Sequence, residues 1–319
     1  MLPKICAALA LGVMAATPLG AQPYPAKPVR FIIPFAPGGG SDFTGRLVAQ
    51  KLSERMGQPF IVENRPGAGG NLGAEMALKS PPDGYTLLII SASYTVNPSV
   101  YKLSFDPIND VTPIIQISGG PYVVAVHPSV PANTLAEFVA LAKKQPEKLA
   151  YGSSGNGSVM HVSTQYFLET AGIKVLHVPY KGTGPALQDT IGGQVQLIFG
   201  AIPTTLPHVK AGRLRALAVT TAKRVAAAPE LPTVAESGYP GYEVTNWHGL
   251  VGPKGLPKEV VERLNREING VITSEDMKKV LASDGLEPAG GSPAQFSEVL
   301  KNEAARWGKV VKEAGIKVE

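Results

Sequence analysis

Residues 29–42 read VRFIIPFAPGGGSD, an apolar run that ends in a glycine-rich turn, and a helical pattern follows at residues 42–56. The apolar run, residues 29–35, is typical of a buried strand. Without Cβ atoms, the three glycines let successive backbone N–H groups turn toward one point, where the helix dipole also favours negative charge. Such a turn attracts an anion such as a carboxylate or phosphate. The simpler alternative is a tight turn in which Ser41 or Asp42 caps the helix.

The same order of strand, loop and helix recurs along almost the whole chain. It predicts an α/β fold with two mainly parallel sheets flanked by helices. From Val111 onward the pattern shifts into a second group of strands and helices, whereas the last three helices have no sheet of their own and must return to the first group. Strands are expected at 59–63, 85–91, 113–118, 121–127, 149–153, 174–178, 195–199, 214–220 and 244–251, and helices at 71–80, 134–145, 159–171, 185–192, 257–272, 274–283 and 293–314.

This arrangement predicts two lobes and two crossings of the chain between them. We expect lobe 1 to comprise residues 22–124 and 249–319, and lobe 2 to comprise residues 125–248. The hinges are then expected near 124–126 and 246–250. Ligands of such sheets bind at the carboxyl ends of the strands, so a ligand cleft is expected between the lobes.

The first 21 residues indicate export. Lys4 precedes an apolar stretch and a small-residue site that ends at Ala21, which is the pattern of a secretory signal peptide at residues 1–21. The chain's single cysteine, Cys6, lies inside this segment, so we expect a periplasmic protein without disulfides. The net charge of +5 is spread along the chain without a basic cluster, which argues against nucleic-acid binding.

Polar loops at predicted strand ends supply the candidate site. The loop at residues 152–158 reads GSSGNGS and offers hydroxyl and amide donors, although it could also be a polar turn with Ser158 as helix cap. Two further loops, at residues 91–94 and 180–185, follow strands as well. The candidate ligand-binding residues are Phe35, Gly38, Gly39, Gly40, Ser41, Asp42, Ser91, Ser93, Ser153, Ser154, Asn156, Ser158, Tyr180 and Gly200.

Catalytic and metal-binding motifs are missing from the sequence. There is no Gly-x-Ser-x-Gly elbow, no P-loop and no His-Glu-x-x-His pair, and the five histidines are far apart. We therefore expect no catalytic residue, no metal and no cofactor.

Six ordered motifs resemble the Bug, or tricarboxylate-receptor, family, the periplasmic solute receptors of tripartite tricarboxylate transporters. They cover the whole chain after the signal peptide. In sequence order they are YPAKPVR at 24–30, PFAPGGGSD at 34–42, VENRPGAGGN at 62–71, PDGYTL at 82–87, VPYKG at 178–182 and LRALAVT at 214–220.

The resemblance implies a two-lobed type II periplasmic binding protein that closes on a small carboxylate and delivers it to separate integral-membrane permease subunits. It also implies that loops 38–42 and 152–158 hold one carboxylate through main-chain amides and water. Many members carry an aspartate where this chain has Gly200 followed by Ala201. Its absence disfavours amino acids, leaves more room, and favours a di-, tri- or aromatic carboxylate. We expect Asp42 to cap the helix or hold water, and we expect a monomer.

Two alternatives use the same residues. A secreted hydrolase could take its nucleophile from Ser153, Ser154 or Ser158, with His161 as the base three residues after Ser158. A ligand sensor for a signalling membrane partner would use the same pocket as a transport receptor.

Overall fold

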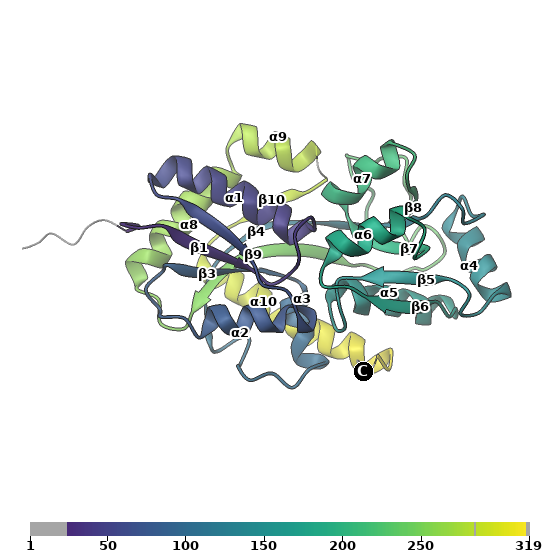
Figure 1. Ribbon diagram of the computed structural model, residues 1–319, viewed down its shortest axis with the longest axis horizontal. Coiled ribbons are helices and arrows are strands. Elements are labelled where there is room, and N and C mark those ends of the chain that lie inside the picture. Colours follow the sequence, from purple (N-terminus) through teal and green to yellow (C-terminus); the bar gives the residue numbers. More distant parts are fainter. Residues whose placement is uncertain (1–23, 284, 317–319) are drawn as a thin grey trace, which may run out of the picture.

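The computed structural model describes residues 24–283 and 285–316 and shows two α/β lobes side by side (Figure 1). The expected signal peptide, residues 1–21, lies outside the described residues. In chain order the elements are β1 (Val29–Ile33), α1 (Gly40–Met56), β2 (Phe60–Asn64), η1 (Ala68–Gly70), α2 (Asn71–Leu78), β3 (Thr86–Ser91), α3 (Ser93–Val96), η2 (Asn97–Ser99), β4 (Val111–Val126), α4 (Leu135–Lys144), β5 (Ala150–Ser153), α5 (Val159–Ala171), β6 (Leu176–Pro179), α6 (Thr183–Ile191), β7 (Leu197–Ala201), α7 (Ile202–Lys210), β8 (Arg215–Val219), β9 (Thr245–Pro253), α8 (Lys258–Ile272), α9 (Glu275–Ser283), β10 (Glu287–Gly290) and α10 (Pro293–Glu313).

Each lobe has a parallel set of outer strands, as the sequence predicts. In the first lobe β2, β1 and β3 are parallel neighbours, and in the second β6, β5 and β7 are. The central strands differ. β4 continues from the first lobe into the second, β9 lies beside it in the first lobe, and both pair antiparallel with each described neighbour. The two-lobed α/β class is thus found, with an antiparallel centre that joins two parallel halves.

Strand β4 is a single strand of 16 residues where the sequence indicates two. The expected break, at Gly119 and Gly120, lies inside the strand because both residues, and Pro121 after them, remain paired with β9. From Tyr122 onward β4 pairs instead with β7 and β8. Proline lacks a backbone N–H and is rare inside sheets. Here it lies where the strand exchanges its partners.

The C-terminal helices return to the first lobe, as expected. Helix α10 packs on β4 and α3, and α8 packs on α1 and β4 (Figure 1). Phe296 of α10 is buried against β9, where its ring meets Trp247 edge-on at 5.8 Å. The indole N–H of Trp247 donates to Glu303 of the same helix at 3.2 Å. The last helix therefore fixes the strand that joins the lobes.

Two short helices were missed by the sequence prediction. Helix α7 contains Pro203 and Pro207, and no helix was predicted at residues 202–210. Pro203 lies in the first turn, where the missing N–H has no intrahelical partner to lose. Helix α3 has only four residues, too few for a periodic pattern.

Packing of α10 on β9 leaves no space beside Gly249. A Cβ there would lie 2.1 Å from Phe296 Cζ, so we expect Gly249→Ala to lower the free energy of unfolding by about 1–3 kcal/mol. The matched control is Gly308→Ala on α10, where the nearest atom, Ser99 Oγ, would be 3.6 Å away. That variant should gain up to about 1 kcal/mol from helix propensity. Urea denaturation checks both, and equal midpoints for the two variants would contradict this packing.

Candidate functional site

A small cavity lies between the lobes, at the ends of strands from both. It is lined by Phe35, Gly40, Ser41, Ser91 and Ser93 from one side, by Ser154 and Thr183 from the other, and by Tyr122 and Asn246 of the connecting strands. None of these nine residues carries a charged side chain. Its volume is about 20 Å³, room for one water molecule. A larger molecule can enter only if the lobes move apart.

The first lobe presents the start of helix α1 to this cavity. Gly38 has φ of +84°, a conformation that glycine adopts without strain, and it turns the chain into the helix. The first intrahelical bond runs from Phe43 N–H to Gly39 O, so the N–H groups of Gly40, Ser41 and Asp42 have no intrahelical partner. Gly40 and Ser41 line the cavity. This end of the helix favours an anion.

Asp42 faces away from the cavity and braces the turn. Its carboxylate accepts from Gly38 N–H at 3.0 Å, Arg46 Nε at 3.0 Å and Asn64 Nδ2 at 3.0 Å. Burial alone raises the pKa of Asp42, but the hydrogen bonds from Arg46, Gly38 and Asn64 outweigh it and hold the pKa below its usual value. The expectation that Asp42 caps the helix is wrong, because the N-cap is Gly39 and no side chain makes a cap hydrogen bond there. Asp42 lies inside the first turn and occupies the Gly38 N–H instead.

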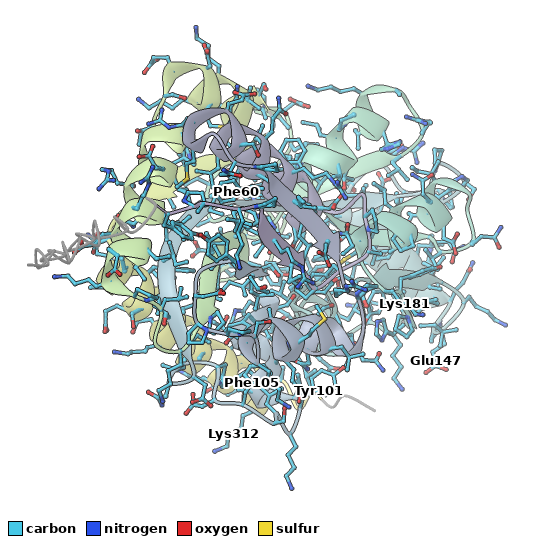
Figure 2. The ribbon with its side chains drawn as sticks, turned by 60° about the vertical axis from the view of Figure 1, so that its left-hand side comes forward. Phe60, Tyr101, Phe105, Glu147, Lys181 and Lys312 are labelled. Carbon is cyan, nitrogen blue, oxygen red and sulfur yellow. The ribbon has the colours of Figure 1, made fainter. Side chains whose placement is uncertain are left out.

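The second lobe brings the start of helix α6 to the same cavity. Gly182 is its N-cap, and Thr183, its first residue, lines the cavity. The two lobes touch here: Ala36 N–H donates to Lys181 O at 2.8 Å, and a Cβ on Gly184 would lie 2.1 Å from Pro37 O. Figure 2 labels Lys181, whose side chain is exposed. Two helix starts, one from each lobe, thus meet at the cavity.

The loop between β5 and α5 closes against the first lobe. Val159 N–H donates to Ser93 Oγ at 3.0 Å, and Tyr101, labelled in Figure 2, donates its hydroxyl to Asn156 O at 2.7 Å. Ser158 caps α5 by accepting from His161 N–H at 3.2 Å. Of this loop, Ser154 lines the cavity, while its neighbours hold the lobes together.

Two stacked imidazoles, His161 and His177, contact the loop between β5 and α5. The rings of His161 and His177 lie 4.0 Å apart, and Tyr151 stacks on His177 at 4.9 Å. His177 Nε2 is 2.6 Å from Ser153 Oγ, and His161 Nδ1 accepts from Gly157 N–H at 3.1 Å. Burial lowers the pKa of His161 to about 4 and, with the neighbouring His161, that of His177 to about 3. Both rings are neutral at pH 7.

The structure brings some of the predicted site residues together and separates others. Phe35, Gly40, Ser41, Ser91, Ser93 and Ser154 line the cavity, whereas Gly38, Gly39 and Asp42 line an outer groove beside α1. Tyr180 donates its hydroxyl to Asp189 at 2.7 Å. Ser153, Asn156 and Ser158 are engaged within the loop or across the lobes.

Gly200 does not provide the space that the sequence suggested. A Cβ at this position would lie 2.0 Å from Thr205 Oγ1, because α7 starts directly after β7 and turns Thr205 back onto it. The room left by the missing side chain is thus filled within the second lobe.

Three lining residues were missed by the sequence prediction. Thr183 lies in the loop predicted at residues 180–185, of which only Tyr180 was a candidate, and its place just before a predicted helix was the available signal. Tyr122 and Asn246 lie inside β4 and β9, where nothing in the sequence separates them from core residues. Only the pairing of these strands places them beside the cavity.

The pairing required by the hydrolase hypothesis is not formed. Ser158 meets the backbone N–H of His161, and the ring Nδ1 of His161 is occupied by Gly157. Among residues 24–283 and 285–316, no group of three or more His, Cys, Asp or Glu side chains is placed to hold a metal ion. Within the same ranges, no helix has the length and apolar character needed to cross a membrane.

Two α/β lobes that share strand β4 and enclose a cavity at their strand ends define the class of bilobed solute-binding proteins. The family model described as tripartite tricarboxylate transporter family receptor matches residues 44–316. The chain therefore belongs to this receptor family, which confirms the resemblance given by the sequence motifs.

Similar proteins support this assignment. Protein BugT of Bordetella pertussis is 35% identical over 311 residues, which cover 95% of this chain and 94% of BugT. Among solved structures, an R. palustris protein with adipate has a TM-score of 0.90 at 40% identity, covering 92% of this chain and 99% of that one. MatC of Rhodopseudomonas palustris with bound malate has a TM-score of 0.85 at 29% identity, covering 90% and 100%. The predicted fold class is thereby confirmed.

Acid should destabilise the protein through its buried histidines. Burial lowers the pKa of His248 to about 4, as it lowers those of His161 and His177, whereas the pKa of an unfolded histidine is about 6.5. The unfolded chain therefore binds more protons as the pH falls from about 6.5 toward 3, and the folded state loses stability over that window. We expect the free energy of unfolding to be at least about 2 kcal/mol lower at pH 5 than at pH 7.5.

Urea denaturation at a series of pH values measures this loss. His177→Gln should flatten the dependence. His127→Gln, at a half-buried histidine whose ring contacts Ser129, is the matched control. A wild-type stability that stays constant between pH 7.5 and 5 would show that these histidines titrate as they do in the unfolded chain.

Proposed function

We propose that this protein is a periplasmic receptor that captures a small carboxylate between its lobes and delivers it to the permease of a tripartite tricarboxylate transporter. The observation that carries the proposal is the uncharged cavity at which helices α1 and α6 begin. Backbone N–H groups and the positive ends of two helix dipoles favour an anion there. The hydroxyls of Ser41, Ser91 and Thr183 can donate to the same carboxylate.

The bound molecules of the relatives agree with this chemistry. Adipate and malate both carry two carboxylates, and each accompanies a structure that superposes on most of this chain. We infer a di- or tricarboxylate, or an aromatic carboxylate, as the ligand class. No catalytic step is part of this proposal, and the transport partner is a separate membrane permease. The receptor acts as a monomer in the proposal.

Capture depends on movement of the two lobes. We propose that the chain consists of lobe 1, residues 22–124 and 249–319, and lobe 2, residues 125–248, with bending in the strands that connect them. Strand β4 pairs with β9 as far as Pro121 and with β7 and β8 from Tyr122 onward. This change of partners favours a bend between Pro121 and Tyr122. A hinge of a few residues at strand junctions is a common device for cleft closure.

A thermal-shift screen tests the ligand class. Adipate, malate, citrate and benzoate are added to the purified protein, with adipamide as a matched compound that lacks the carboxylates. A ligand bound only by the folded state raises the melting temperature, by an amount that grows with its concentration. We expect at least one of the acids, and not the amide, to do so. If no acid shifts the transition, the carboxylate proposal is refuted.

Closure is tested at Gly184, which meets the first lobe only when the lobes are together. A Cβ at this position would lie 2.1 Å from Pro37 O, so Gly184→Ala should hold the cleft partly open. We expect at least about 10-fold weaker binding of the carboxylate found in the screen, by titration calorimetry, with little change in the unliganded melting temperature. The matched control is Gly192→Ala at the other end of α6, where the nearest atom would be 3.4 Å away. Wild-type affinity in Gly184→Ala would argue against closure.

A further inference from the structure

A buried chain of polar side chains runs from helix α1 to the cavity. His248 Nδ1 lies 3.3 Å from Thr44 Oγ1, and His248 Nε2 lies 3.5 Å from Asn246 Nδ2. The exposed fractions of Thr44, His248 and Asn246 are 0%, 1% and 6%. Asn246 and His248 are two residues apart on β9 and therefore lie on the same face of the sheet.

The available donors fix the proton positions along this chain. Burial lowers the pKa of His248 to about 4, so at neutral pH one ring nitrogen donates and the other accepts. The amide nitrogen of Asn246 can only donate, which makes Nε2 the acceptor. Nδ1 then carries the proton and donates to Thr44 Oγ1. One N–H of the Asn246 amide is thus directed to His248.

The amide oxygen of Asn246 has no hydrogen-bond donor in the described part of the chain. Asn246 lines the cavity, and its Oδ1 is buried. Leaving a buried acceptor unpaired costs free energy that a suitable donor would recover. The hydroxyls around the cavity can rotate to donate or accept, but an amide oxygen only accepts. A carboxylate oxygen would be repelled by it, whereas a donor on the ligand would satisfy it.

We propose that Asn246 recognises a ligand hydroxyl, so that the receptor selects hydroxycarboxylates over carboxylates of the same length that lack the hydroxyl. The inference rests on the proposed function and adds a second chemical group to the ligand. The carboxylate accepts from the N–H groups at the starts of α1 and α6. The neighbouring hydroxyl donates to Asn246 Oδ1, whose position is held by His248 and Thr44.

Malate and succinate form the matched pair of ligands, since they differ only in one hydroxyl. Titration calorimetry on the wild-type protein should give about 10- to 100-fold tighter binding of malate. Asn246→Leu removes the acceptor at nearly constant volume and should bring the affinity for malate down to that for succinate. Ser118→Ala is the control, because Ser118 is buried opposite His248 in the β4–β9 register but does not line the cavity. It should keep the preference.

The outcomes separate this inference from the proposed function. Equal wild-type affinities for malate and succinate would overturn the selection by Asn246 and leave a carboxylate receptor in place. Equal loss of both acids in Asn246→Leu would also overturn it, because the amide would then donate to the carboxylate. If neither acid binds, and adipate and citrate fail as well, both proposals are rejected. Should Asn246→Leu fail to fold, Asn246→Ala replaces it. Should that variant fail as well, the wild-type affinities for malate and succinate decide the question.

Discussion

The shared strand β4 is the constraint on which the rest of the structure depends. It hydrogen-bonds to β9 and β10 in one lobe and to β7 and β8 in the other, so both sheets are built on one continuous backbone. The ends of the outer parallel strands of the two lobes therefore face each other across the cavity. Helix α10 holds β9, the second connecting strand, by burying Phe296 over Gly249. Without β4 and β9, the loops at residues 38–42 and 152–158 would not be held on opposite sides of one cavity.

The site uses backbone groups where many anion sites use arginine or lysine. No charged side chain lines the cavity, and the starts of α1 and α6 supply the positive potential. A site of this kind attracts a carboxylate without requiring a buried cation, which would be costly when the ligand is absent. The carboxylate of Asp42, within the turn, accepts hydrogen bonds from three donors and stabilises the turn. Specificity is then left to the neutral groups, above all to Asn246.

Much of this arrangement could be predicted from local patterns. The strand, glycine turn and helix at residues 29–56 form as expected, and so does the return of the C-terminal helices to the first lobe. Local patterns failed where a partner from far along the chain decides the outcome. The break expected at Gly119 and Gly120 is bridged by pairing with β9, and α7 forms despite two prolines and fills the space beside Gly200. In loop 152–158 the sequence offered Ser153, Ser154, Asn156 and Ser158 as ligand-binding residues. Ser154 lines the cavity, while the others make hydrogen bonds within the loop, to the other lobe or to a buried imidazole.

The sequence by itself determined the α/β class, the receptor family and the turn at Gly38–Asp42, because these depend on local periodicity, on glycine conformation and on ordered motifs. Only the tertiary structure decided which residues meet at the cavity. Asn246, His248 and Thr44 come from β9 and α1, about 200 residues apart in the chain, and nothing local marks them as a unit. Their role arises because sheet pairing buries them together, and a buried polar atom must find its partner in three dimensions.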